Sequence, residues 1–301
     1  MAGGKKYELT DETIEIDGIH CGDHLTLYRI RALRDFGDVK AGQLGGFVES
    51  EDSLSHKGLC FVYDNAEVFF GAKVCEHAKI YDSTKVYREG TVISGHAEIY
   101  GDAEVSGSVY EHAKVYDNAE VGGSVSGHAK IHDSAVVYHG VEISGDAEVY
   151  DHAVVWGGTI SGDAKVYGHA KVYDDAKVFD DAEVFGDAEI YDYAQVGGKA
   201  KIYGFAKVYG DAEVYGHAKV YDDAKVFDDA EVYDEAEVFD SAKIYGHARV
   251  YSEAIVCDNA RVYGDAKVYG NAKVYACAEI CEHAEVTEGV IDFTVCGHEH
   301  C

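Results

Sequence analysis

The sequence lacks proline altogether, contains one methionine and one tryptophan, and has 26 basic residues against 56 acidic ones. Because proline cannot donate a hydrogen bond to a strand ladder, its absence permits a long uninterrupted run of paired strands. The formal net charge of -30 at pH 7 disfavours direct binding to nucleic acid or anionic membranes and favours a basic partner. The same charge would also keep a protein with many exposed tyrosines soluble, so this second interpretation stays open.

No run of eighteen apolar residues is present, and the first residues, 1–6, are polar rather than typical of a secretory leader. We therefore expect a cytoplasmic protein without a membrane partner. Phosphate loops and nucleophile elbows are also absent, so we expect no cofactor. Among the eight cysteines, Cys75, Cys257 and Cys281 occupy a position that tyrosine usually fills in the repeat described below. This position predicts free surface thiols rather than a disulfide framework.

A six-residue repeat dominates what is present, and it runs without a break over residues 161–286 in forms such as YGDAEV, YGHAKV and YDDAKV. Each repeat has an alanine followed two residues later by valine or isoleucine, as in Ala164 and Val166. A spacing of two places both side chains on one face of an extended strand, with the lysine or glutamate between them and the following aromatic residue directed outward. The next two residues, such as glycine and aspartate, favour a turn. Each repeat therefore predicts a short strand and a corner, with every alanine and valine inside.

A single repeat cannot bury its own apolar face, whereas three repeats can close a triangular coil that stacks on its neighbours. The pattern resembles the left-handed parallel β-helix of hexapeptide-repeat proteins, which implies an all-β fold. The segment RIRALRDFGDVKAGQLGGFVE, followed by LSHKG and VYDNA, resembles the N-terminal part of uncharacterised bacterial and phage members, which are often labelled acyltransferases. This resemblance implies a microbial or phage origin and assigns no catalytic residue.

We expect three regions. Residues 1–62 form a small β-rich N-terminal cap, 63–286 form the β-helix, and 287–301 form a C-terminal cap that folds over the open end. Within the cap, the alternation in LTLYRIRAL predicts Tyr28 and Ile30 on one face of a strand.

The repeat is less regular over residues 87–160, where one odd side follows two normal repeats in each coil. These odd sides are rich in glycine, serine and threonine, and their spacing predicts that they stack into one face. That face would hold Trp156, His139 and Glu142. This face is either a shallow docking groove or the result of sequence variation without function in a repeat that accepts many residues. The second interpretation is the simpler one.

Histidine is the base that the resemblance to acyltransferases would require. Nine of the sixteen histidines share one corner position, which elsewhere holds aspartate, asparagine, serine or phenylalanine, so this position is expected to be solvated. His139 lies outside that pattern and is the candidate catalytic base. These nine are His77, His96, His112, His128, His152, His169, His217, His247 and His283.

Two metal sites can also be considered. A cluster near the C-terminus could bind zinc, although its spacing matches no known finger and free thiols are the simpler interpretation. Paired aspartates at the corners could bind calcium, but the six-residue period is not that of the calcium-binding nonapeptide. The zinc candidates are Cys277, Cys281, Cys296, His298, His300 and Cys301.

The main hypothesis for function is a non-enzymatic acidic rod that engages a basic protein surface, with no cofactor. One form of this hypothesis is a mimic of duplex nucleic acid that inhibits a host nucleic-acid-binding or defence protein. The alternatives are a trimeric acyltransferase that uses acyl-CoA, and a structural spacer, so a homo-oligomer stays open. The binding candidates are Trp156, Glu142 and the corner aspartates Asp174, Asp175, Asp180, Asp181, Asp222, Asp223, Asp228 and Asp229.

Overall fold

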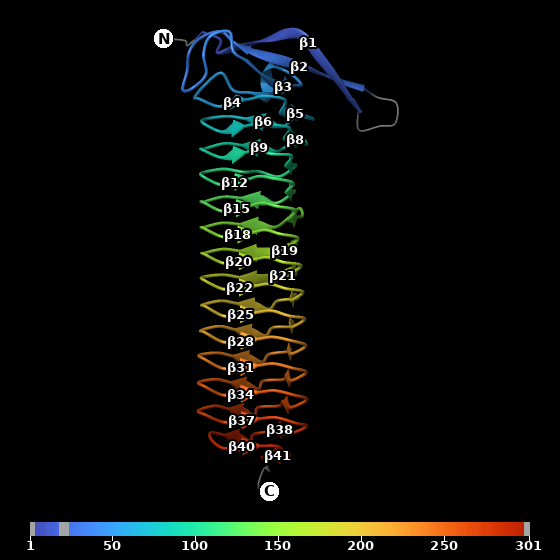
Figure 1. Ribbon diagram of the computed structural model, residues 1–301, viewed down its shortest axis with the longest axis vertical. Coiled ribbons are helices and arrows are strands. Elements are labelled where there is room, and N and C mark those ends of the chain that lie inside the picture. The colour runs from blue at the N-terminus through green and yellow to red at the C-terminus, as the bar shows by residue number, and fades with distance from the viewer. Residues whose placement is uncertain (1–3, 18–23, 298–301) are drawn as a thin grey trace. The chain divides into compact units, whose positions relative to one another are not determined.

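The structure is a computed structural model that describes residues 4–17 and 24–297. The described chain divides into two compact units, residues 1–145 and 146–301, which we treat separately. Both are β-solenoids in which short parallel strands recur coil after coil (Figure 1). No described helix is long and apolar enough to cross a membrane. The all-β solenoid predicted from the repeat is therefore confirmed, whereas its left-handed sense stays a prediction.

In the unit 146–301 each repeat forms a short strand and a two-residue corner, as predicted. Three strands complete a coil, so residues 18 apart pair in parallel register, for example Lys165 with Glu183 and Glu183 with Lys201. The strands are β18 (Glu148–Val149), β19 (Val154–Ile160), β20 (Lys165–Val166), β21 (Lys171–Val178), β22 (Glu183–Val184), β23 (Glu189–Ile190), β24 (Gln195–Val196), β25 (Lys201–Ile202), β26 (Lys207–Val208), β27 (Glu213–Val214), β28 (Lys219–Val220), β29 (Lys225–Val226), β30 (Glu231–Val232), β31 (Glu237–Val238), β32 (Lys243–Ile244), β33 (Arg249–Val250), β34 (Ile255–Val256), β35 (Arg261–Val262), β36 (Lys267–Val268), β37 (Lys273–Val274), β38 (Glu279–Cys281), β39 (Glu285–Val286), β40 (Val290–Ile291) and β41 (Val295–Cys296).

The core of this unit consists of the predicted alanines and valines. Val214 and Val226 are fully buried, and every repeat alanine and valine or isoleucine from Ala164 to Val286 is at most 6% exposed. The outward residues are more covered than expected, because most lysines, glutamates and aromatic rings are half-buried. Aromatic rings one coil apart stack, as in Tyr191 on Tyr209 with centroids 4.7 Å apart. Stacking thus protects side chains that the sequence predicts to be fully exposed.

The first residue of most corners has a left-handed backbone, which explains why glycine and aspartate alternate there. Gly162 has a φ of 71° and Asp180, one coil later, has a φ of 58°. Glycine reaches this region without steric cost, and aspartate tolerates it better than most residues do. The corner sequence is therefore set by backbone geometry as well as by solubility.

In the unit 1–145, an antiparallel arrangement of three strands precedes the coils: β1 (Tyr7–Asp17), β2 (His24–Ala32) and β3 (Leu44–Val48). Strand β3 then pairs in parallel with β5, which starts the ladder. Of the residues predicted to share one face of β2 with Tyr28, Ile30 and Ala32 are buried, whereas Tyr28 itself is 36% exposed and Leu27 is buried. The pairing of β2 with β3 is irregular, because the step from Arg29 to Arg31 is matched by the longer step from Phe47 to Leu44.

The coils of this unit vary in length. Glu98 pairs with Lys79, 19 residues earlier, and with Lys114, 16 residues later. The remaining elements are η1 (Glu51–Ser53), β4 (Phe61–Val62), β5 (Glu67–Phe69), β6 (Lys73–Val74), β7 (Lys79–Ile80), β8 (Lys85–Tyr87), β9 (Val92–Ile93), β10 (Glu98–Ile99), β11 (Glu104–Val105), β12 (Lys114–Val115), β13 (Glu120–Val121), β14 (Ser124–Val125), β15 (Lys130–Ile131), β16 (Val136–Val137) and β17 (Glu142–Ile143).

The described residues 287–297 lie beside the preceding coil, because β40 pairs with β37 and β41 pairs with β38, and the chain continues the parallel ladder there. The C-terminal cap itself stays a prediction, and residues 298–301 lie outside the described residues. Val290 and Phe293 are 61% and 58% exposed and therefore supply no apolar cover. The boundaries predicted at residues 62 and 286 stay predictions.

Candidate functional site

Within residues 87–143, the irregular sides lie one above another, as their spacing predicts. Isolated parallel bridges join Ile93 to Val109 and Val109 to Val125, and β14 pairs with β17. The aromatic position that follows Val105 and Val121 holds Ser106 and Gly122, so the column of stacked rings is interrupted here. The removal of those rings leaves a groove.

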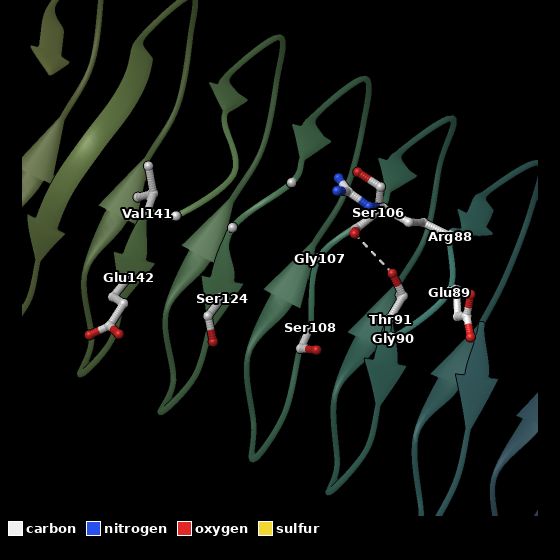
Figure 2. Close-up of a pocket in the computed structure, with 13 residues that line it drawn as sticks. Arg88, Glu89, Gly90, Thr91, Ser106, Gly107, Ser108, Ser124, Val141 and Glu142 are labelled. Carbon is white, nitrogen blue, oxygen red and sulfur yellow. Dashed lines mark hydrogen bonds between the residues drawn. The ribbon is translucent and has the colours of Figure 1, made fainter. Parts of the chain in front are cut away.

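The groove has a volume of about 360 Å³ and presents polar side chains from successive coils (Figure 2). The buried Thr91 anchors one part of it, because its Oγ1 lies 2.8 Å from the carbonyl oxygen of Ser106. Glu142, a predicted binding residue, lines the groove and is exposed. The full lining is Arg88, Glu89, Gly90, Thr91, Ser106, Gly107, Ser108, Gly122, Gly123, Ser124, Gly140, Val141 and Glu142.

Close contact between coils requires the glycines on this side. A Cβ atom on Gly107 would lie 1.9 Å from the carbonyl oxygen of Gly123, and one on Gly123 would lie 2.6 Å from that of Val141. Real side chains do not tolerate such contacts. The glycine-rich composition therefore has a packing cause, and the groove is its consequence.

His139 lies at the edge of the groove and is held at both ring nitrogens. Its Nδ1 donates a hydrogen bond to the carbonyl oxygen of Gly122 at 2.7 Å, since a carbonyl can only accept. Its Nε2 contacts the guanidinium of Arg88, which can only donate. The bond to Gly122 fixes the imidazole with the lone pair on Nε2, which is the arrangement that a general base needs. However, the ring is exposed, and the lone pair of Nε2 faces the Arg88 guanidinium. Arg88 would have to move before Nε2 could accept a proton from a substrate.

A larger hollow of about 1090 Å³ shares Arg88 and Thr91 with the groove and was not predicted from the sequence. Phe70 and Tyr87 supply its apolar surface, and Glu49 lies on the side of the N-terminal segment. Phe70 and Arg88 both have positive φ values, 51° and 91°. Residues other than glycine seldom have a positive φ, and bulky ones do so least often. The repeat pattern does not predict this backbone geometry at Phe70 and Arg88, which is why sequence analysis missed the hollow.

The corner aspartates divide into two kinds according to their position. The first aspartate of a corner accepts a hydrogen bond from a backbone amide one coil later, as Asp180 does from Gly198 at 3.2 Å. Asp192 and Asp228 do the same for Gly210 and Gly246. The carboxylate of Asp181, at the second position, has no such bond. Part of the acidic composition is therefore structural.

The structure does not bring all the predicted aspartates together. Because three corners complete a coil, consecutive repeats place their aspartates on three different edges of the solenoid. The pairs at 174–175 and 228–229 share one edge, since 54 residues make three coils of 18. The pairs at 180–181 and 222–223 lie on the other two edges.

We call the edge that contains Asp175 the acidic edge. No lysine or arginine forms an ion pair with its carboxylates within the described residues 174–282. Two of them face histidines instead: Asp229 lies 3.7 Å from His247, and Asp265 lies 3.3 Å from His283. Its carboxylates belong to Asp174, Asp175, Asp192, Asp211, Asp228, Asp229, Asp265 and Glu282.

Trp156 lies in strand β19 of the unit 146–301 and pairs with Tyr173 of β21. Its side chain is 67% exposed, which makes it the most exposed large hydrophobic residue described. Its relation to the groove of the unit 1–145 stays a prediction.

The corner histidines form stacked columns. In the unit 1–145 the rings of His77, His96, His112 and His128 follow one another with centroids 4.8, 5.0 and 4.9 Å apart. A stack of this kind offers neither a pocket nor an orienting carboxylate to any one ring. The arrangement agrees with the interpretation of this position as a corner rather than a catalytic site.

The predicted zinc cluster is only partly described. Cys281 and Cys296 form a disulfide, so the prediction of a free surface thiol at Cys281 is wrong, and that residue is 3% exposed. Cys75, Cys257 and Cys277 are free, and Cys277 is exposed. The other three candidates, His298, His300 and Cys301, lie outside the described residues. Zinc binding stays a prediction, and it would require the reduced form of Cys281 and Cys296.

No family model matches the chain. Over 74 residues the sequence is 35% identical to an Escherichia coli (strain K12) protein named "Uncharacterized acetyltransferase YdcK". The match covers 23% of this chain and 22% of that protein, so the chain spans about a fifth of its relative's length. This similarity and the β-solenoid fit the hexapeptide-repeat β-helix proteins that are labelled acyltransferases.

Proposed function

We propose that this chain is a non-enzymatic binding protein whose acidic edge engages a basic protein surface. One observation carries the proposal. The glutamates on the strands are paired with lysine or arginine in most cases, as Glu183 is with Lys201 at 3.1 Å, whereas the carboxylates of the acidic edge have no such partner. Their charge is therefore available to a partner.

The acidic edge also has a regular spacing. Coils of a parallel ladder repeat at about 4.8 Å, so its carboxylates stand at multiples of that distance on a rigid support. Duplex nucleic acid likewise presents rows of negative charge at fixed spacing. A protein that normally binds nucleic acid is the class of basic partner that fits this edge best.

The test reverses charge on the acidic edge without disturbing the fold. Asp175, Asp211 and Asp229 occupy second corner positions and accept no backbone hydrogen bond, so their replacement by lysine should leave the solenoid folded. The matched control replaces Asp163, Asp187 and Asp223, which lie on the other two edges, and changes the net charge equally. Binding to a nine-residue polylysine peptide is measured by calorimetry at several salt concentrations.

We expect the wild type to bind with a steep dependence on salt and the acidic-edge variant to bind about tenfold more weakly. The control variant should lose much less affinity. An equal loss in both variants would show that only net charge matters, and absence of binding by the wild type would overturn the proposal. Replacement of His139 by alanine should change nothing, because that residue is no part of the acidic edge.

A second candidate function is acyl transfer, and the position of His139 favours it together with the similarity to a protein named as an acetyltransferase. In this candidate, Arg88 would move to release Nε2, which would then accept the proton of an acceptor hydroxyl or amine bound in the groove. Thermal-shift and calorimetric titrations with acetyl-CoA provide the test. Binding that is lost on replacement of Glu142 or Arg88 would support the enzyme, and no binding at millimolar acetyl-CoA would exclude it.

A further inference from the structure

One column of aromatic rings in the unit 146–301 is missing a member. Along the outward side that follows β21, β24 and β27, the register places residues 179, 197 and 215 one above another. Phe179 and Tyr215 occupy two of these positions, but the one between them is Gly197. In the complete columns neighbouring rings lie 4.7 to 5.1 Å apart, so a gap of two coils separates these two rings.

The gap is a cavity of about 270 Å³. The ring of Phe179 leans into the empty position, since a Cβ atom on Gly197 would lie 2.3 Å from its Cε2. Tyr215 bounds the other side and is 36% exposed, so one aromatic face stays open to solvent. The cavity is lined by Phe179, Asp180, Gln195, Gly198, Glu213, Val214, Tyr215 and Gly216.

The same cavity holds an unpaired strand glutamate. In successive coils Glu213 lies between Gln195 and Glu231, neither of which is a cation. The next residue of this column, Arg249, forms its ion pair with Glu231 at 3.0 Å. Lys177 lies on the far side of Gln195, two coils from Glu213. Among strand glutamates of this unit Glu213 alone has no cation partner, because pairs are formed by Glu148, Glu183, Glu189, Glu231, Glu237, Glu279 and Glu285.

A missing ring and an uncompensated carboxylate therefore coincide at one place in an otherwise regular surface. Asp180 adds a second carboxylate, of which one oxygen is already bonded to the amide of Gly198. Lys199, next to Gly198 in the same corner, is exposed and forms no ion pair with any described residue. The site thus combines a flat aromatic face with local negative charge.

We propose that this cavity, which we call the aromatic slot, receives an arginine side chain of the basic partner. The guanidinium group is planar, stacks on aromatic faces and forms two parallel hydrogen bonds with a carboxylate. In the slot it would lie against Tyr215 and pair with Glu213. The ammonium group of lysine lacks the flat face, so the slot discriminates between the two cations. This inference rests on the proposed function and names the residue that the partner contributes.

The test uses two nine-residue peptides, polyarginine and polylysine, and two variants. Gly197→Tyr fills the slot with the residue that the repeat normally has there. Gly197 has no positive φ, and the obstructing ring of Phe179 can return to its own position, so the fold should tolerate this change. Glu213→Gln keeps the shape of the slot and removes its charge.

For each protein we compare the ratio of its affinity for polyarginine to its affinity for polylysine. We expect this ratio to be about three- to tenfold larger for the wild type than for either variant. Both variants should keep the wild-type affinity for polylysine, which also confirms that they are folded. A preference that is unchanged by Gly197→Tyr would overturn the slot and leave the acidic edge intact. If neither peptide binds the wild type, the proposed function fails together with the slot.

Discussion

The regular repeats of residues 161–286 and the irregular sides of residues 87–143 have the same kind of core but differ on the surface. In the regular part, outward tyrosines and phenylalanines stack in columns, as Tyr203 does on Tyr221 at 4.8 Å. In the irregular part, glycine and serine replace the rings and a groove opens. The inward alanine and valine residues build the coil in both parts, whereas the aromatic columns add stability where they are present. A groove opens where Ser106 and Gly122 take the aromatic position, and the slot at Gly197 shows that one substitution suffices.

The largest effect should come from a substitution in the alanine and valine core that each part has. Val214→Asp places a charge without a partner in a fully buried position. We expect the free energy of unfolding to fall by about 4 kcal/mol or more, measured by chemical denaturation. The control is Glu213→Gln on the same strand, which should change it by less than about 0.5 kcal/mol. A mild effect of Val214→Asp would mean that the core relaxes far more than its packing suggests.

The two surfaces should differ when side chains are removed. Tyr209 stacks on Tyr191 and on Phe227, with centroids 4.7 and 4.9 Å away. Tyr209→Ala should therefore destabilise the protein by about 2 kcal/mol, from two ring contacts and lost apolar burial. Ser124→Ala in the groove should have an effect near zero. Equal effects in the two variants would contradict the view that the aromatic columns stabilise the regular part.

Alkaline pH should weaken the regular part. Burial, with Glu183 as the next contribution, raises the pKa of Tyr167 to about 12, and burial followed by Tyr209 raises that of Tyr191 to about 12. In the unfolded chain tyrosine ionises near pH 10. The raised pKa values therefore stabilise the fold fully below about pH 10, and this contribution disappears as the pH rises through about 12.

The measurement combines tyrosinate absorbance with the free energy of unfolding at several pH values. Stability should decline from about pH 10 upward, and most tyrosinate absorbance should appear late and together with unfolding. Ionisation of most tyrosines near pH 10 without loss of structure would show that the rings are not protected.

The smallest effect should separate the two corner positions. Asp180→Gly keeps the left-handed backbone available but removes the hydrogen bond to the amide of Gly198, at a cost of about 1 kcal/mol. Asp180→Ala should cost more, since alanine disfavours a positive φ. Asp181→Ala should be nearly neutral in a thermal denaturation measurement. If Asp181→Ala costs as much as Asp180→Gly, the carboxylate of Asp180 has no structural role.

The sequence predicts the fold well because its period is fixed and its inward residues are unambiguous. Strands, corners, the buried alanines and valines, and the stacking of the irregular sides over residues 87–143 all follow from spacing. Local irregularity is where prediction fails. Tyr28 is exposed although Ile30 of the same strand is buried, and Cys281 reaches Cys296 because the chain adds further ladder beyond Val286.

The candidate site was predictable only in part. Glycine-rich sides indicated a groove, and Glu142 does line it. The division of the corner aspartates into structural and free positions was not predictable, since it depends on contacts one coil away. That consecutive aspartate pairs lie on different edges follows from the predicted three-sided coil, although the candidate set combined pairs from all three edges. The slot at Gly197 had a visible signal, a repeat that begins with glycine where an aromatic residue is usual.

The pairing of residues 18 apart constrains how such a chain can change its length. Removal of three whole repeats from the regular part would leave every remaining side chain in its original column. Each side chain would then still contact the same type of residue in the coils next to it. Removal of one repeat would instead rotate everything downstream by one side, moving the acidic edge and the aromatic slot to new directions. Genetic duplication or loss of complete turns would thus lengthen or shorten the scaffold while preserving its recognition surface, whereas smaller changes would scramble it.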